Sequence, residues 1–393
     1  MSSSRPSNEE PIVRDRMPEL DVVRGIAILS VVIFHGFGDS LFIPTARPAW
    51  QRLVMDVAGQ GWAGVNLFFV LSGFLITGIL IDSTGRPDYY SRFYVRRALR
   101  ILPPYYLMLI VILLWRFATG TPGRTVVEFG ALSTIYLSNV SALFGVDFLY
   151  PLLWSLSVEE HFYLLWPALV RNLSRRALGI AAALICVAEP ALRLYDLSNG
   201  GKLWWAGSHH GGAYIYTWMM ADGLALGALL ALLGRSRWGT RRNFFRLAIA
   251  TFAVSVAATA ASVLVSQPLG LCLRGTVVNY FALALIAGAL WLGTGAHRRW
   301  VNVPVLAFYG YISYGLYLVH DWIAGVYYTL LARFAPGLLP NLDFAKICLA
   351  IVVIAAVSTG VAYLSRVTYE EFFLRRKPGA QRAQAARRAA VSA

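Results

Sequence analysis

An arginine and a histidine lie eleven residues apart in the first apolar segment of the chain, LDVVRGIAILSVVIFHGF, residues 20–37. In an α-helix this spacing is about three turns, or about 16 Å, so Arg24 and His35 share nearly one face. Ionisable side chains inside a bilayer are costly and mark functional sites by default. A histidine can act as a general base near neutral pH, and an arginine can bind an anion. For a lone histidine, a plain hydrogen bond inside a helix bundle is the alternative.

A cluster of arginines follows in YYSRFYVRRALRILPPYY, residues 89–106. Arg97 and Arg100 are three residues apart and share one helix face, with Arg96 beside them. Guanidinium groups bind phosphate oxygens through two parallel hydrogen bonds, so the cluster suits phosphate recognition. It could equally be the ordinary basic flank of a membrane helix. Pro103–Pro104 is expected to break or kink the helix.

Two adjacent glutamates lie within the apolar segment LLWSLSVEEHFYLLWP, residues 152–167. Glu159 shares a helix face with Ser155 and Tyr163, at spacings of four residues, whereas Glu160 is expected to point elsewhere. One glutamate could hydrogen-bond a neighbouring helix. The other could orient a base or bind a hydroxylated substrate.

Two further apolar segments carry polar side chains. Asp222, in WMMADGLALGALLA, could pair with an arginine from another helix or face a polar cavity. In GYISYGLYLVHDW, residues 310–322, one helical stripe contains Ser313, Tyr317 and His320. Because intramembrane His, Glu and Asp residues also form proton relays, a proton-coupled multi-pass transporter is an alternative function. A sensor or scaffold without catalysis is a third.

The composition predicts a polytopic integral membrane protein of the all-α class. Of 393 residues, 58% are hydrophobic and only 14% are charged, whereas a soluble protein carries about 25% charged residues. Many apolar runs approach the ~20 residues that a helix needs to cross a bilayer. We expect about ten membrane helices, at residues 20–38, 61–82, 103–118, 152–170, 177–195, 214–234, 245–266, 276–294, 303–331 and 344–366.

The net charge of +15 is explained by membrane topology rather than by nucleic-acid binding. With the N-terminus in the cytoplasm, most of the 35 Lys and Arg residues fall in the cytoplasmic loops, as the positive-inside rule requires. Both termini are therefore expected to be cytoplasmic. Residues 1–16 form a polar segment without a signal-peptide pattern, and residues 17–372 form the membrane domain. Residues 373–393 are expected to be a basic tail, disordered or lying on anionic lipid.

Neither a disulfide nor a metal site is expected. Cys186, Cys272 and Cys348 lie in apolar segments without paired spacing and are interpreted as small buried side chains. The adjacent His209 and His210 lack the spacing of a good metal site.

Together these motifs resemble those of the acyltransferase-3 family, the membrane O-acyltransferases of bacteria and some eukaryotes. The resemblance rests on the shared order of Arg24-x10-His35, GVNLFFVLSGFLITG, Arg97-x-x-Arg100, LWSLSVEEHFYLLWP, MADGLALGALLA and YISYGLYLVH. It implies ten membrane helices in a bacterial inner membrane. It also implies transfer of an acyl group, commonly from acetyl-CoA, to a carbohydrate-type hydroxyl. Such an acceptor is a cell-envelope polysaccharide, a lipid-linked glycan or a glycosylated small molecule.

The resemblance also implies roles for the charged residues. Arg97 and Arg100, helped by Arg96 and Arg24, would hold the phosphates of cytoplasmic acyl-CoA. His35 would act as general base on the acceptor hydroxyl, or would carry the acyl group transiently.

The remaining polar residues receive supporting roles in this interpretation. Glu159 would orient the histidine or the sugar. The reaction's oxyanion would accept hydrogen bonds from Ser155, Tyr317 or a backbone amide. Substrate-binding or structural roles are expected for Tyr163, Asp222, Ser313 and His320.

This chain departs from the family pattern at Asn66, where the family often has Asp. The role of that acid is then filled differently or is absent. Family members with a fused extracytoplasmic esterase-like domain are longer than this chain, so a partner is expected for any such step.

Overall fold

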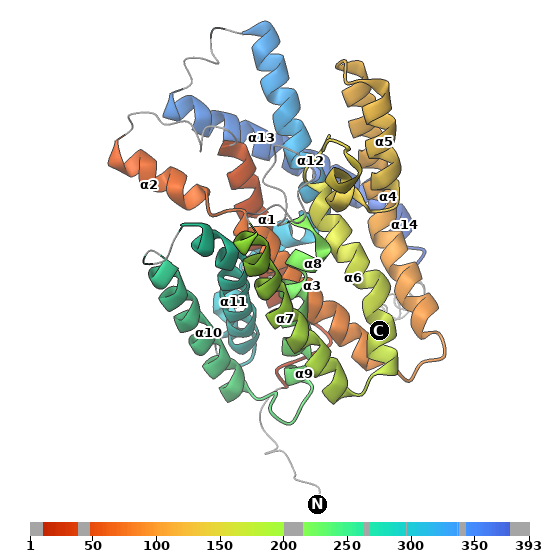
Figure 1. The fold of residues 1–393 in the computed structure, drawn as a ribbon, viewed down its shortest axis with the longest axis vertical. Coiled ribbons are helices and arrows are strands. Elements are labelled where there is room, and N and C mark those ends of the chain that lie inside the picture. The colour runs from red at the N-terminus through yellow and green to blue at the C-terminus, as the bar shows by residue number, and fades with distance from the viewer. Residues whose placement is uncertain are drawn as a thin grey trace, which may run out of the picture.

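The computed structural model describes residues 11–37, 48–199, 215–262, 264, 267–295, 297–335, 337 and 343–377. Within these residues the fold is all-helical and contains no strand, as the sequence predicts (Figure 1). The α-helices are α1 (Glu19–Phe37), α2 (Ala49–Ala58), α3 (Ala63–Ser83), α4 (Tyr89–Ala118), α5 (Gly123–Thr134), α6 (Leu153–Asn172), α7 (Arg175–Ser198), α8 (Thr217–Met220), α9 (Asp222–Gly234), α10 (Arg241–Ser262), α11 (Gln267–Gly293), α12 (Pro304–Phe334), α13 (Phe344–Ser365) and α14 (Glu371–Leu374). Two short 3-10 segments, η2 (Ser138–Phe144) and η4 (Arg298–Val301), and a π-helical segment, η6 (Arg366–Glu370), complete the set.

Each of the ten predicted membrane segments contains helical structure. Among the described residues, seven helical segments are long and apolar enough to cross a membrane, by length and composition. They are Glu19–Phe37, Ala49–Ser83, Tyr89–Ala118, Arg175–Ser198, Arg241–Ser262, Cys272–Gly293 and Phe344–Leu374. The number of ten spans and the cytoplasmic position of both termini stay predictions.

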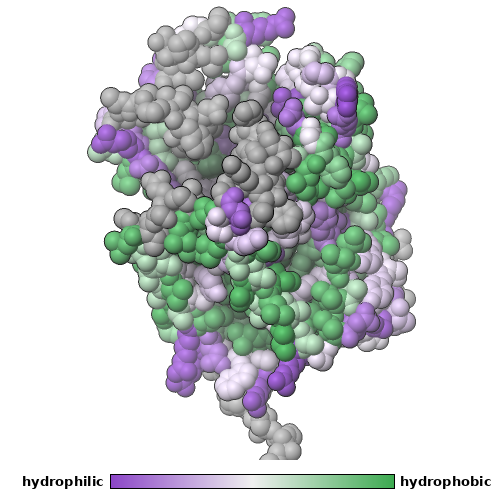
Figure 2. All heavy atoms as spheres, in the orientation of Figure 1, coloured by the Kyte–Doolittle hydropathy of each residue, from purple (hydrophilic) through white to green (hydrophobic). Residues whose placement is uncertain are grey.

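The surface of the molecule is that of a membrane-embedded bundle. Large apolar side chains are widely exposed, among them Leu164 and Leu165 at 64% each and Val187 at 69%. Figure 2 shows apolar residues over the middle of one face, with hydrophilic residues gathered mainly toward its two ends. A bilayer accepts such a surface, whereas contiguous apolar patches of this extent are rare on soluble monomers.

Glycines allow α1 and α12 to approach backbone to backbone. A Cβ atom at Gly25 of α1 would collide with the carbonyl oxygen of Leu306 in α12. A Cβ atom at Gly310 of α12 would collide with the carbonyl oxygen of Asp21 in α1. Small residues at helix interfaces permit this close packing in membranes. The contact sets the arginine and histidine of α1 against the polar stripe of α12.

A second close pair is formed by α3 and α9. A Cβ atom at Gly73 of α3 would collide with the carbonyl oxygen of Leu224, and one at Gly227 of α9 with that of Val70. This contact holds the start of α9, where Asp222 lies, beside the middle of α3.

The prolines of the arginine-rich segment do not break their helix. Pro103 and Pro104 both lie inside α4, which runs without interruption over 30 residues. The arginine cluster and the apolar segment after it therefore belong to one long helix. The predicted break at this point is wrong, and the alternative, a kink, stays a prediction.

Candidate active site

A cavity of about 190 Å³ lies between α1, α3, α4, α6 and α12. Three arginines line it, Arg24, Arg97 and Arg100, together with Glu159 and Glu160. We call it the arginine cavity. Its other polar lining residues are Ser72, Ser155, Tyr163, Ser313, Tyr314 and Tyr317. The structure thus brings together residues that the sequence predicted from four separate motifs.

Two of these arginines are available to an anionic ligand. In the described part of the chain, no carboxylate lies within 4.0 Å of the guanidinium of Arg97 or Arg100. Arg97 instead lies over the ring of Tyr163, with its guanidinium carbon 5.7 Å from the ring centroid. Arg24 pairs with Asp21 one turn earlier on α1. An unpaired arginine fork suits a phosphate or a similar anion.

The structure places Arg96 and Lys377 differently from the sequence-based prediction. Arg96 is exposed and does not line the arginine cavity, although the sequence grouped it with Arg97 and Arg100. Lys377, just after α14, interacts with these arginines. Burial, and then the like charges of Arg100, Arg97, Arg96 and Arg366, lower the pKa of Lys377 to about 7. Sequence reasoning missed it because composition alone placed residues 373–393 in a tail.

Glu159 is held by hydroxyl groups inside the arginine cavity. Ser72 Oγ donates to Glu159 Oε1 at 2.8 Å, and Tyr163 Oη donates to Glu159 Oε2 at 3.0 Å. Both carboxylate oxygens are thereby engaged, and no described contact joins Glu159 to His35. The structure therefore does not support Glu159 as the group that orients the histidine. Glu160 also lines this cavity, contrary to the expectation that it points elsewhere.

His35 has a second histidine as its partner. Its Nδ1 lies 2.9 Å from the carbonyl oxygen of Val31 and 3.3 Å from Nε2 of His320. His320 Nδ1 lies 3.0 Å from the carbonyl oxygen of Leu316. Because a carbonyl only accepts, both Nδ1 atoms carry the proton, and His320 Nε2 accepts from His35. His35 Nε2 is then left as a free base.

His35 lies on a different cavity from the arginines. This second cavity, of about 320 Å³, is lined by His35 and by Phe34, Trp62, Val65, Asn66, Leu152, Trp154, Arg193, Met220, Cys272, Arg274, Gly275 and Tyr317. We call it the histidine cavity. Val65 and Tyr317 line both cavities and separate them. The Tyr317 hydroxyl lies at hydrogen-bond distance from Ser155 Oγ and donates to the carbonyl of Leu152 at 3.3 Å.

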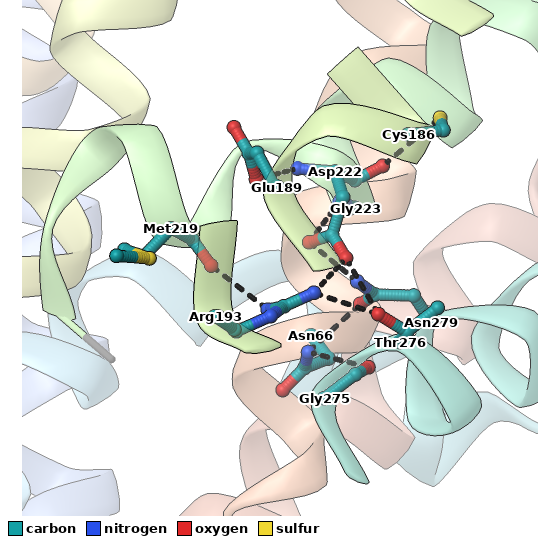
Figure 3. A network of polar contacts seen from close by, with 10 residues as sticks. All are labelled: Asn66, Cys186, Glu189, Arg193, Met219, Asp222, Gly223, Gly275, Thr276 and Asn279. Atoms are coloured by element: carbon teal, nitrogen blue, oxygen red, sulfur yellow. Dashed lines mark hydrogen bonds and ion pairs between the residues drawn. The ribbon is translucent and has the colours of Figure 1, made fainter. Parts of the chain in front are cut away.

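Asp222 belongs to a buried polar network rather than to a cavity (Figure 3). Its Oδ2 accepts from Arg193 at 2.6 Å, and both side chains are 1% exposed. Arg193 also donates to Thr276 Oγ1, and Glu189 accepts from the backbone N–H of Asp222 at 2.7 Å. The prediction that Asp222 could pair with an arginine of another helix is confirmed.

The same network accounts for Asn66. Asn279 Nδ2 donates to Asp222 Oδ1 at 2.9 Å, which turns its own Oδ1 toward Asn66 (Figure 3). Asn66 Nδ2 donates to that oxygen at 2.8 Å. An ionised aspartate at this position would set an acceptor against an acceptor. In this chain a neutral amide is therefore the side chain that fits position 66.

Other predicted residues have mainly structural contacts. Ser313 lines the arginine cavity, and its hydroxyl donates to the carbonyl of Gly310 at 2.9 Å. Sequence reasoning missed Ser72, Trp62 and Arg193, because only their tertiary positions distinguish them from packing residues.

His209 and His210 lie outside the described residues. Among the described residues, no three His, Cys, Asp or Glu side chains form a group that could hold a metal.

The described residues form a helical membrane protein in which a cavity lined by three arginines adjoins a cavity lined by His35. A family model described as an acyltransferase domain matches residues 17–363. The chain belongs to this acyltransferase-3 family. The match covers the motifs from the first helix onward and favours group transfer over the transporter alternative.

Named relatives agree with this family. The chain is 31% identical over 199 residues to YrhL of Bacillus subtilis, which is provisionally named a peptidoglycan O-acetyltransferase. These 199 residues make up 46% of this chain and 29% of YrhL. It is 30% identical over 167 residues to the peptidoglycan O-acetyltransferase OatA of Listeria monocytogenes, covering 39% and 24% of the two chains. The chain thus covers less than a third of the length of either relative. No solved structure matches it.

Proposed function

We propose that this protein is a membrane O-acetyltransferase. In this function it moves an acyl group, most simply acetyl, from cytoplasmic acyl-CoA to a hydroxyl of a carbohydrate acceptor in the cell envelope. One observation carries the proposal: the cavity with the unpaired arginines and the cavity with the histidine base meet at Tyr317. Donor and acceptor can therefore approach one another from two sides of one wall.

The arginine cavity is the proposed donor site. Arg97 and Arg100 supply the positive charge that the phosphates of acyl-CoA require, and Arg24 contributes to the same lining. The cavity continues from these arginines toward Ser155 and Tyr317 and so offers a path for the acyl end. Lys377 interacts electrostatically with Arg100 and Arg97, and in this proposal it adds a further cation for the phosphates.

His35 is the proposed general base. Its free Nε2 removes the proton of the acceptor hydroxyl while the hydroxyl oxygen attacks the thioester carbonyl carbon. As the new C–O bond forms, the carbonyl electrons move onto oxygen, which accepts the Tyr317 hydroxyl hydrogen bond in place of the carbonyl of Leu152. The C–S bond then breaks, and the sulfur takes the proton from His35. The products are the acetyl ester and free CoA thiol.

The proposed class of acceptor comes from the names of the relatives. Two of them carry names that specify peptidoglycan O-acetylation, and a third from Staphylococcus aureus, 29% identical over 235 residues, is provisionally named an O-acetyltransferase. That match covers 55% of this chain and 35% of the relative. A cell-envelope glycan is accordingly the proposed acceptor, and the inner membrane of a bacterium is the proposed location.

The test is release of CoA thiol from acetyl-CoA by the purified protein in detergent. We expect steady release by the wild type and a loss of about 10²–10⁴-fold in His35→Ala, which lacks the base. Equal rates in the two proteins would show that His35 is not the base. Proton-coupled solute flux in proteoliposomes, with no thiol release, would favour the transporter instead.

A further inference from the structure

The histidine cavity differs in chemistry from the arginine cavity. Its volume of about 320 Å³ exceeds the 190 Å³ of the arginine cavity and lies within the usual range for a small-molecule site, about 300–1,000 Å³. Of its two arginines, Arg193 is neutralised by Asp222. Only Arg274 then contributes net charge to the lining, so the cavity suits a ligand with little charge of its own.

Two N–H groups of the lining lack an acceptor. Trp62 Nε1 and Arg193 Nε are both buried, and neither has a hydrogen-bond partner among the described residues. A buried donor without an acceptor is unfavourable, and a ligand that supplies oxygen atoms removes the penalty. Both of these N–H groups are hydrogen-bond donors, so the complementary ligand is rich in hydroxyl or carbonyl oxygens.

Aromatic side chains form another part of the lining, beside the apolar Val65, Leu152 and Met220. Trp62, Trp154 and Phe34 surround the cavity, and the guanidinium of Arg274 stacks on Trp62 with its carbon 4.5 Å from the ring centroid. Arg274 also donates to Gln60 Oε1 at 2.6 Å, which fixes the stacked pair. Aromatic faces with polar edges match a sugar ring, whose C–H faces are apolar and whose rim carries hydroxyls.

We propose that the histidine cavity binds a sugar ring of the acceptor glycan and presents one of its hydroxyls to His35 Nε2. This assignment rests on the proposed acetyl transfer and adds the place where the acceptor binds. Trp62 packs against the ring and donates from Nε1, and Arg193 Nε donates to a second oxygen. Tyr317 lines both cavities, so the sugar hydroxyl and the acyl carbon of the donor meet beside the hydroxyl of Tyr317.

The experiment measures binding of a soluble glycan, the tetramer of N-acetylglucosamine, to the full chain in nanodiscs by calorimetry. Trp62→Phe keeps an aromatic face and loses the N–H, and we expect about tenfold weaker binding. Trp62→Ala loses both and should bind still more weakly. Arg97→Gln should bind the glycan as the wild type does, because Arg97 does not line the histidine cavity and the proposed sugar contacts remain.

Binding of acetyl-CoA in the same samples separates this inference from the proposed function. We expect it to be unchanged in both Trp62 variants and weakened in Arg97→Gln. Glycan binding that is absent from the wild type, or unchanged in both Trp62 variants, overturns the sugar site. Glycan binding that is lost in Arg97→Gln places the acceptor in the arginine cavity instead. Failure of the wild type to bind or turn over acetyl-CoA counts against the proposed function and not against the sugar site.

Discussion

At the scale of single residues, the proposed acetyl transfer depends on one proton on each of two histidines. The i–4 carbonyls of Val31 and Leu316 each hold an Nδ1 proton, which leaves His320 Nε2 as an acceptor for His35. When His35 takes up a proton it becomes a cation, and the lone pair of His320 faces that cation. In the proposed mechanism His320 is accordingly a positioning residue that acts through His35 rather than on the substrate.

Replacing His320 should lower turnover without affecting donor binding. His320→Ala removes the acceptor at 3.3 Å, and we expect kcat to fall about tenfold, as for a lost hydrogen bond to a charged group of ~1.5 kcal/mol. His320→Gln keeps an oxygen acceptor and should recover most of that loss. Steady-state kinetics and acetyl-CoA binding measure the two effects. Equal losses in both variants would indicate a role in packing only.

If the arginine cavity binds the donor as proposed, Lys377 should make that binding sensitive to pH. Burial, and then the positive charges of Arg100, Arg97, Arg96 and Arg366, lower its pKa to about 7, while Glu370 is the acid near it. Above pH 7 the free protein therefore carries mainly neutral Lys377. A bound phosphate favours the charged form, so binding at pH 8 should take up a proton.

Calorimetry of CoA binding in buffers of different ionisation enthalpy measures this proton uptake. We expect the wild type to take up a proton on binding CoA at pH 8, and its affinity for CoA to weaken from pH 7 to pH 9. Lys377→Arg should show neither effect, because its guanidinium stays charged. An identical pH dependence in wild type and Lys377→Arg would show that Lys377 does not face the phosphates.

At the scale of helices, glycine contacts decide which motifs meet. The α1–α12 contact at Gly25 and Gly310 places the base beside its histidine partner. Helix ranges could be predicted from sequence, because runs of apolar residues and polar loops alternate clearly. The pairing of α1 with α12 could not be predicted, because a glycine that permits close contact and one that faces lipid look alike in a single sequence.

Gly310→Ala should therefore destabilise the protein. The added Cβ would meet the backbone of Asp21, and overpacking of this kind costs about 1–3 kcal/mol. Gly325→Ala, on the same helix with nothing within 4 Å of the added atom, is the matched control and should be neutral or slightly stabilising. Thermal unfolding in detergent measures both. Similar unfolding midpoints for the two variants would contradict the close contact.

At the scale of the whole molecule, a buried network joins four helices around the start of α9. Arg193 of α7 and Thr276 and Asn279 of α11 contact Asp222, and Asn66 of α3 joins the network through Asn279 (Figure 3). The sequence indicated that Asp222 needs a partner. It could not identify Arg193, which sequence patterns assign to a helix flank, nor reveal that two cavities are divided by Tyr317.

Removing the charge of Asp222 should destabilise the whole bundle. Asp222→Asn leaves Arg193 buried without a counter-ion, and such a loss costs about 3–5 kcal/mol. Glu128→Gln breaks the exposed pair with Arg124 and should cost no more than ~1 kcal/mol. Unfolding midpoints in detergent compare the two variants. A loss in Asp222→Asn no larger than the loss in Glu128→Gln would show that the network contributes little.

The measurement that tests the central claim most directly pairs acetyl-CoA affinity with the rate of a single turnover in two variants. His35→Gln should bind acetyl-CoA as the wild type does and lose about 10²–10⁴-fold in rate. Arg97→Gln should bind it about tenfold or more weakly, as for a lost charged hydrogen bond, while the rate at saturation stays near that of the wild type. One variant loses rate and the other loses affinity, because His35 and Arg97 line two different cavities that meet at Tyr317. Loss of affinity and rate together in both variants would contradict the separation of donor binding from base catalysis.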